Sequence, residues 1–220
     1  MKIWAKETFC MALIIFDFDG VLADTLDDLI QFGQEACDEL GVKHVVRKAD
    51  LSNLEIMSFA SFGRACEVPE HLIDEFVQRC LKRFAEKKSP PAIFNELSTI
   101  VRNLSINHTI AIITTNSSQN VNAFLAEHGL SGCIHTVYGV DSPGSKAEKI
   151  SMARHRHSPS TKPELVFMVG DSLSDIRAAK ETATTSIAVT WGHQSLEYLL
   201  SGDPDYVAHA PHDLIEIIEK

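Results

Sequence analysis

Residues 12–25 read ALIIFDFDGVLADT, and this stretch decides the fold. Its first five residues, Ala12 to Phe16, are all apolar. An apolar run without polar alternation is typical of a strand that is buried on both faces of a parallel sheet. The run stops abruptly at Asp17 and Asp19. We therefore predict a buried strand whose carboxyl end carries acidic side chains.

Further short apolar runs alternate with helical patterns along the rest of the chain. Alternation of this kind is the signature of a parallel sheet covered by helices. The chain is accordingly assigned to the α/β class, with a Rossmann-like parallel sheet core and helices on both faces. The runs are Ile110 to Thr114, Val166 to Val169 and Ser186 to Val189, with weaker ones at Thr136 to Tyr138 and Tyr206 to Val207.

One interval breaks this alternation. Between Thr25 and Pro90 only helical patterns occur. Thr25 is a candidate N-cap for a helix that ends at Gly41, and Pro69 is placed as the first residue of another helix. A helical block inserted after the first strand predicts a cap over the end of that strand. We expect a helical cap over residues 25–90 and an α/β catalytic core made of residues 1–24 and 91–220.

Composition excludes several classes of function. The formal net charge of −10 and the lack of a basic stripe argue against a nucleic-acid partner, and no apolar stretch is long enough to span a membrane. Five cysteines without CxxC spacing favour reduced thiols over a disulfide framework or a zinc site. These features predict a cytoplasmic protein. The cysteines are Cys10, Cys37, Cys66, Cys80 and Cys133.

Four polar clusters fall at predicted strand ends or helix starts. In open parallel sheets, ligands bind beyond the carboxyl ends of the strands. Any one cluster alone is equally consistent with ordinary helix caps and turns. Four clusters at one edge of the sheet, three of them carrying carboxylates or a lysine, instead favour a functional site. The clusters are DFDGVLADT at 17–25, TTN at 114–116, GSK at 144–146 and GDSLSD at 170–175.

These clusters resemble the four sequence motifs of the haloacid dehalogenase superfamily, whose members are mostly phosphatases. They occur in the family's order, and the resemblance covers essentially the whole chain, including the position of the cap. The stretch IAVTWG at 187–192, followed by Asp203 to Val207, is similar to the phosphoglycolate phosphatase branch. The resemblance implies a Mg²⁺-dependent phosphatase that acts on small phosphorylated metabolites through an aspartyl-phosphate.

The resemblance also implies a role for each acidic residue. Asp17 would be the nucleophile and, with Asp171, a ligand of Mg²⁺. Asp19 would contribute its backbone carbonyl to the ion, and Asp175 would be either a further ligand or a hydrogen-bond acceptor for groups around the ion. The carboxyl group of Asp19 would protonate the leaving group and then activate water, which favours phosphate esters as substrates.

The remaining implied roles concern the phosphoryl group. Lys146 would place a positive charge against both the nucleophile and the phosphate. Thr115, the backbone near Asn116 and the backbone N–H of Phe18, which follows Asp17, would bind the phosphoryl oxygens.

Two alternatives remain open, and the substrate is unassigned. One is a sugar phosphomutase, which shares the aspartate pair and the cap, although Gly170-Asp171 is the phosphatase-like form of the fourth motif. The other is a non-catalytic sensor of phosphate ligands. In the cap, Arg47, Lys48 and Arg64 are either solvated surface cations or contacts for a second anionic group of the substrate.

Overall fold

A six-stranded, fully parallel sheet forms the centre of the protein, with the strand order β5-β4-β1-β6-β7-β8. The computed structural model describes residues 11–55, 57–87, 89–157 and 165–220. The central strand β1 (Leu13–Phe16) pairs with β4 on one side and with β6 on the other. The other strands of the sheet are β4 (Thr109–Ile113), β5 (Thr136–Tyr138), β6 (Val166–Gly170), β7 (Thr185–Val189) and β8 (Tyr206–Ala208). The predicted fold class is confirmed.

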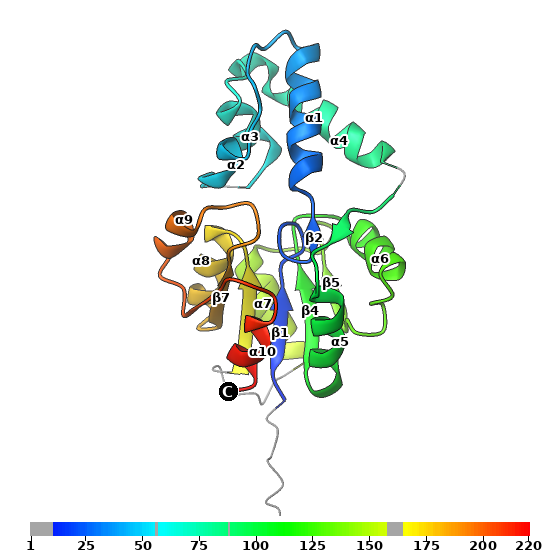
Figure 1. The fold of residues 1–220 in the computed structure, drawn as a ribbon, viewed down its shortest axis with the longest axis vertical. Coiled ribbons are helices and arrows are strands. Elements are labelled where there is room, and N and C mark those ends of the chain that lie inside the picture. Colours follow the sequence, from blue (N-terminus) through cyan, green and yellow to red (C-terminus); the bar gives the residue numbers. More distant parts are fainter. Residues whose placement is uncertain (1–10, 56, 88, 158–164) are drawn as a thin grey trace, which may run out of the picture.

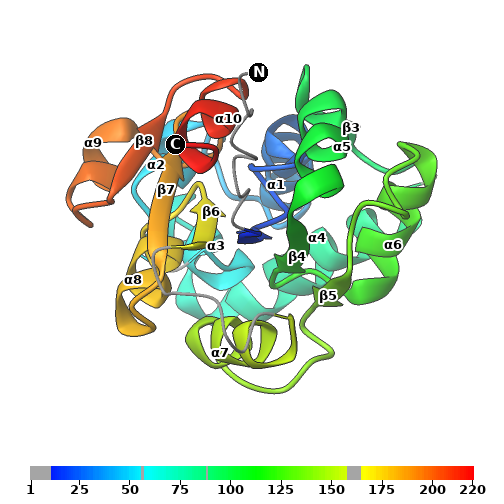
Figure 2. The ribbon, with the colours of Figure 1, turned by 90° about the horizontal axis from the view of Figure 1, so that it is seen from below.

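Helices cover both faces of this sheet, as Figures 1 and 2 show. Side chains of a strand alternate between its two faces, so Leu13 and Ile15 pack with α7 and α8, whereas Ile14 and Phe16 pack with α5, α6 and α10. Burial on both faces explains why β1 is apolar throughout. The helices of this core are α5 (Leu97–Asn107), α6 (Ser118–Glu127), α7 (Lys146–His157), α8 (Leu173–Glu181), α9 (Leu196–Leu200) and α10 (Asp213–Ile218).

A second group of helices lies beyond the carboxyl end of β1, at the top of Figure 1. It packs around its own apolar cluster, which includes Phe62 and Phe76. Two short antiparallel strands, β2 (Ala23–Asp24) and β3 (Ala92–Ile93), carry the chain out of the core and back. We call this group the cap. It comprises α1 (Leu26–Glu39), α2 (Ala49–Ser52), α3 (Phe59–Ala65), a 3₁₀ turn at Glu70–Leu72 and α4 (Ile73–Glu86).

Two expectations about helix starts need correction. Thr25 occupies the N-cap position of α1, but its side chain makes no cap hydrogen bond and its hydroxyl instead contacts the His193 ring. Pro69 does not open an α-helix. It precedes the 3₁₀ turn, and α4 begins only at Ile73.

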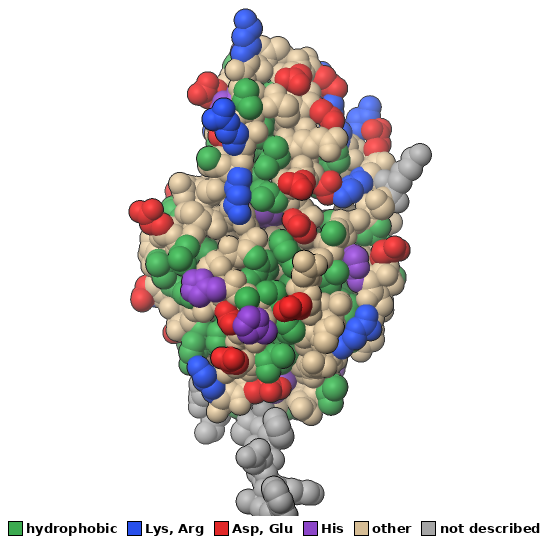
Figure 3. Space-filling model, in the orientation of Figure 1, with side chains coloured by type: hydrophobic (Ala, Val, Ile, Leu, Met, Phe, Trp, Pro, Cys, Tyr) green, Lys and Arg blue, Asp and Glu red, His purple; other side chains and the backbone are tan. Residues whose placement is uncertain are grey.

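Surface and cysteine features bear on the predicted partners. In Figure 3, Asp and Glu side chains are interspersed with Lys and Arg over the face shown. No helix within the described parts of the chain is both long and apolar enough to cross a bilayer. Cys37, Cys66, Cys80 and Cys133 are free thiols, while Cys10 lies outside the described residues.

Candidate active site

Three buried carboxylates meet at the carboxyl end of the sheet. Carboxylate oxygens of Asp17, Asp171 and Asp175 all lie within 4.8 Å of one another. Asp17 follows β1 and Asp171 follows β6, and these two strands are neighbours in register. The parallel sheet therefore brings together acidic residues that lie more than 150 positions apart in the sequence.

The loop after β1 forms a tight turn that is closed by hydrogen bonds between its own backbone groups. The carbonyl of Phe18 accepts hydrogen bonds from the N–H groups of Val21, Leu22 and Ala23. Gly20 has a φ of +78°, and a Cβ there would overlap the Asp171 carboxylate. Glycine is therefore required at this position both for its backbone conformation and for the close approach of the two motifs.

Asp175 is held by groups on both sides of its carboxylate. One oxygen accepts from the Ser172 N–H at 3.1 Å, a bond of the capping box at the start of α8, and also from the Ser172 hydroxyl at 2.5 Å. The other oxygen accepts from the Lys146 ammonium at 2.5 Å. Lys146, the first residue of α7, also lies 3.3 Å from Asp17. The lysine thus bridges the first and fourth motifs.

Asp19 is not part of the three-carboxylate cluster and has partners of its own. Its Oδ2 accepts a hydrogen bond from the Asn116 side-chain amide at 3.2 Å. Asn116 is itself fixed, because its side-chain oxygen accepts from Ser117 N–H and from the Asn120 amide. Asp19 is accordingly anchored to the second motif at the end of β4. A role for its backbone carbonyl stays a prediction.

The two remaining predicted phosphate contacts differ in their surroundings. The Phe18 side chain is buried against Phe124 in the core, so that only its backbone N–H faces the site, where it donates toward the Asp17 carboxylate. Thr115 is exposed at the end of β4 and lines a hollow of about 430 Å³ together with Lys146.

Burial and crowding change the acidity of these groups. Burial raises the pKa of Asp17 well above its usual range; Lys146 opposes this shift, while Asp175 and Asp171 add to it. Burial also raises the pKa values of Asp19 and Asp171. For Lys146, burial lowers the pKa, but the charges of Asp17 and Asp175 outweigh burial and leave it raised. The site therefore places three carboxylates close together, and the positive charge of Lys146 offsets part of their mutual repulsion.

His193 belongs to this site and was missed by the sequence reasoning. His193 is 3% exposed, and its backbone N–H donates to the Asp171 carboxylate at 2.7 Å. Its ring Nδ1 lies 3.3 Å from the same carboxylate. Its Nε2 contacts the Thr25 hydroxyl at 3.2 Å, and the Thr25 side chain hydrogen-bonds to Asp19. His193 therefore links the metal-site candidate to the acid–base candidate. Its position just past a buried strand was the available signal.

The same loop joins the core to the cap. The Lys48 ammonium donates to the Gly192 carbonyl at 3.1 Å, and the Gln194 amide donates to the Leu54 carbonyl at 2.7 Å. Gly192 packs directly against Asp171, since a Cβ there would overlap that side chain. Of the three predicted cap cations, Lys48 thus reaches the edge of the site.

The bonds recorded for the other two predicted cap cations stay within the cap. Arg64 is exposed and pairs with Glu70 at 2.6 Å, and Arg47 is exposed with its backbone N–H bonded to Asp50. Neither pairing involves a residue of the core.

Comparison with known proteins agrees with this geometry. The chain is 26% identical over 209 residues to a phosphoglycolate phosphatase from Synechococcus elongatus, covering 94% of this chain and 97% of the relative. It is 27% identical over 217 residues to one from Vibrio vulnificus, with coverages of 94% and 95%. A haloacid dehalogenase-like family hydrolase from Streptococcus pneumoniae has the same fold, with a TM-score of 0.82, 25% identity and coverages of 94% and 98%.

A family model provides the assignment. The model described as haloacid dehalogenase-like hydrolase matches residues 14–189, which include all four motifs and the whole cap. With its acidic cluster, bridging lysine and inserted helices, the chain belongs to the haloacid dehalogenase-like hydrolases.

Proposed function

We propose that this enzyme is a Mg²⁺-dependent phosphatase that hydrolyses small phosphate monoesters through an aspartyl-phosphate on Asp17. The observation that carries the proposal is the buried cluster of Asp17, Asp171 and Asp175, bridged by Lys146. The curated relatives described as phosphoglycolate phosphatases support the same reaction class.

The donor set of this cluster fits Mg²⁺. Mg²⁺ prefers hard oxygen ligands, and the three converging side chains offer only carboxylate oxygens. Two unit charges 4 Å apart repel by about 4 kcal/mol at an effective dielectric of 20, so one lysine leaves the cluster undercompensated. A bound Mg²⁺ would offset the charge of these carboxylates and of the phosphoryl group. We assign Asp17, Asp171, Asp175 and the Asp19 backbone carbonyl as its ligands.

The chain's own groups would then perform two displacements. A carboxylate oxygen of Asp17 attacks phosphorus, and the bond from phosphorus to the ester oxygen breaks while Asp19 donates a proton to that oxygen. In the second step, Asp19 takes a proton from water, the water oxygen attacks phosphorus, and the bond to Asp17 breaks to release inorganic phosphate. The raised pKa of Asp19 favours its acting as an acid.

Other groups would hold the phosphoryl oxygens during these steps. Lys146 supplies a fixed positive charge beside the nucleophile. Thr115, the backbone near Asn116 and the Phe18 N–H are assigned as hydrogen-bond donors to the same oxygens.

Lys48 suggests which leaving group is preferred. Its ammonium lies at the boundary between cap and core, bonded to the carbonyl of Gly192, a residue whose Cα packs against Asp171. A cation at this place favours a small ester whose leaving group carries a negative charge. Phosphoglycolate, the substrate in the names of the curated relatives, has such a group.

The cellular setting proposed for this reaction is the cytoplasm. The free thiols of Cys37, Cys66, Cys80 and Cys133 support a reducing compartment.

The proposal is tested with the purified full chain and a panel of phosphate monoesters that includes phosphoglycolate and hexose phosphates. We expect Mg²⁺-dependent release of inorganic phosphate, loss of turnover in EDTA and its recovery on adding Mg²⁺. An isomerised sugar phosphate in place of free phosphate would indicate a mutase. No turnover of any ester with Mg²⁺ present would contradict an enzymatic role and favour a sensor.

A further inference from the structure

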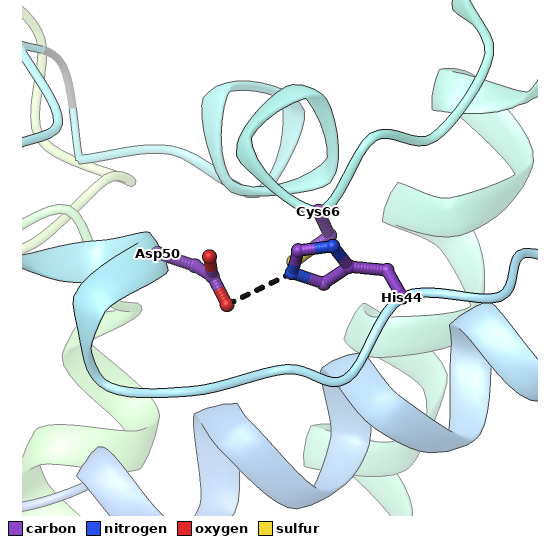
Figure 4. Close-up of side chains that lie close together, drawn as sticks. All are labelled: His44, Asp50 and Cys66. Atoms are coloured by element: carbon purple, nitrogen blue, oxygen red, sulfur yellow. Dashed lines mark hydrogen bonds and ion pairs between the residues drawn. The ribbon is translucent and has the colours of Figure 1, made fainter.

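A second cluster of side chains of metal-ligand types lies inside the cap and shares no residue with the three-aspartate cluster. A ring nitrogen of His44, a carboxylate oxygen of Asp50 and the sulfur of Cys66 all lie within 4.8 Å of one another. In Figure 4, the Asp50 carboxylate and the Cys66 sulfur both lie on the Nε2 side of the His44 ring. We propose that His44, Asp50 and Cys66 form a binding site for a thiophilic divalent cation such as Zn²⁺.

The three residues come from separate parts of the cap. His44 lies in the segment between α1 and α2, Asp50 belongs to α2, and Cys66 is the C-cap residue of α3. The backbone of the first segment is fixed on α1, because the Gln34 side chain bonds to both the His44 carbonyl and the Val46 N–H. The site is thus built on ordered elements, and an ion there would tie those elements together.

The donor chemistry separates this site from the three-aspartate cluster. Imidazole, thiolate and carboxylate are the ligand types that bind Zn²⁺, whereas Mg²⁺ prefers oxygen alone. Metal–ligand bonds of about 2.0–2.3 Å place donors roughly 3.3–3.8 Å apart in a tetrahedral site. His44 Nε2 and Asp50 Oδ2 are already 3.0 Å apart. The sulfur lies no more than 4.8 Å from either atom, so a displacement of at most about 1 Å brings it into range.

Neighbouring groups complete the site. The thiols of Cys37 and Cys66 are in hydrogen-bonding contact, so Cys37 from α1 is available as a fourth donor. The Arg47 N–H donates to the same Asp50 oxygen at 2.7 Å, which orients the carboxylate. The side chains of His44 and Asp50 are 18% and 17% exposed, which gives an ion a path from solvent. Cys66 is fully buried, which argues against a role as an enzymatic nucleophile.

A hydrogen-bonded histidine–aspartate pair alone would account for two of these residues. It gives no reason for a thiol beside the same nitrogen. When an ion binds, the Cys66 S–H bond breaks, its proton passes to solvent, and a sulfur–metal bond forms. The charges of the thiolate and of Asp50 then balance those of the divalent ion.

The test uses Co²⁺ as a spectroscopic probe of sulfur ligation, with Mg²⁺ in excess to occupy the oxygen site. We expect one equivalent of Co²⁺ to give a sulfur-to-metal charge-transfer band that Zn²⁺ displaces. Cys66→Ala should abolish the band, and His44→Gln and Asp50→Asn should weaken Zn²⁺ affinity at least about tenfold. Cys133→Ser, which changes a thiol outside the cap, is the matched control and should leave the band intact.

Two results would overturn the site. One is the absence of the band together with no effect of Zn²⁺ on the melting temperature of the wild-type protein. The other is unchanged binding in His44→Gln and Asp50→Asn, whose partly exposed positions keep the test valid if Cys66→Ala does not fold. The Mg²⁺-dependent activity is measured separately, so its failure is distinguishable from that of this site.

Discussion

Asp17 and Asp19 lie two residues apart, yet their neighbours differ in ways that suit the two different roles proposed for them. Asp17 faces Lys146 at 3.3 Å and two further carboxylates, which suits a nucleophile beside a cation. Asp19 faces the neutral amide of Asn116 at 3.2 Å, and burial raises its pKa. A carboxyl group in that setting can keep a proton until the leaving oxygen needs it.

Asp19→Asn is expected to separate the two steps of the reaction. The variant keeps the Asn116 contact but cannot donate or accept the proton, so turnover of alkyl phosphates should fall by about 10²–10⁴-fold. With p-nitrophenyl phosphate, whose leaving group needs no proton, a burst of phenolate should precede slow turnover. Rapid-quench kinetics with both substrates check this. Equal losses in the burst for both esters would exclude Asp19 as the acid.

His193→Gln is expected to lower the affinity of the enzyme for Mg²⁺ rather than to unfold the protein. The ring contacts both Asp171 and Thr25, and loss of such supporting contacts typically costs about 10–100-fold in metal affinity or activity. Titration of activity with Mg²⁺ measures the change. His209→Gln, an exposed histidine after β8, is the control. An unchanged Mg²⁺ titration curve in His193→Gln would remove this residue from the site.

The arrangement of some site residues can be predicted from local sequence, whereas that of others depends on the complete fold. The meeting of Asp17 and Asp171 at one edge of the sheet could be predicted, because each directly follows a strand that the sequence indicates. The contact of Thr25 with His193 could not, since 168 positions separate the two and only the completed sheet brings them together. Locally, Thr25 has the features of a helix cap, and the sequence interpretation accordingly misassigned its hydroxyl.

At the scale of elements, α2 with the preceding Lys48 and the loop after β7 form a contact between cap and core. Lys48 donates to Gly192, and the Ser195 N–H donates to the Ser52 carbonyl at 2.9 Å. Both bonds attach the cap to the loop whose residues Gly192 and His193 contact Asp171. The choice of leaving group is therefore expected to depend on this contact.

Lys48→Met is expected to discriminate among substrates. Methionine keeps most of the apolar stem but removes the charge, so KM for esters with an anionic leaving group should rise about tenfold, which corresponds to about 1.4 kcal/mol. The kcat for p-nitrophenyl phosphate should stay the same. Steady-state kinetics on both esters measure the effect, with the exposed Lys43→Met as control. A parallel change for both substrates would contradict a role in recognising charge.

Elements of the core were predictable to within a residue or two, because their signal is local. The runs at Ile110 to Thr114 and Val166 to Val169 correspond to β4 and β6. The cap was harder to read. The 3₁₀ turn after Pro69 and the short α2 depend on how α1, α3 and α4 pack together, which no periodic pattern records.

For the whole molecule, the acidic cluster that the proposed reaction requires is expected to lower the stability of the metal-free protein. Burial raises the pKa values of Asp17 and Asp171, so the metal-free folded state holds protons more tightly than the unfolded chain does. These groups therefore reduce stability as the pH rises from the unfolded pKa through the folded pKa. Mg²⁺ should restore that stability at neutral pH.

Asp171→Asn is expected to raise the melting temperature of the metal-free protein, because it removes one buried negative charge. For a chain of this size, each kcal/mol corresponds to about 2–4 °C. The wild type should gain about 2.7 kcal/mol when Mg²⁺ reaches 100 times its Kd, and the variant much less. Calorimetry with and without Mg²⁺ checks both points. The difference between the two metal-free proteins should shrink below the folded pKa of Asp171, and a constant difference would contradict its cause.

The most direct test is the chemical identity of the residue that receives the phosphoryl group. The wild-type protein is acid-quenched during turnover with Mg²⁺ and substrate, digested, and analysed by mass spectrometry. We predict one added phosphoryl group on the peptide that contains Asp17, and none in Asp17→Asn. Turnover without any phosphorylated aspartate, or with the label on another residue, would contradict the proposed nucleophile.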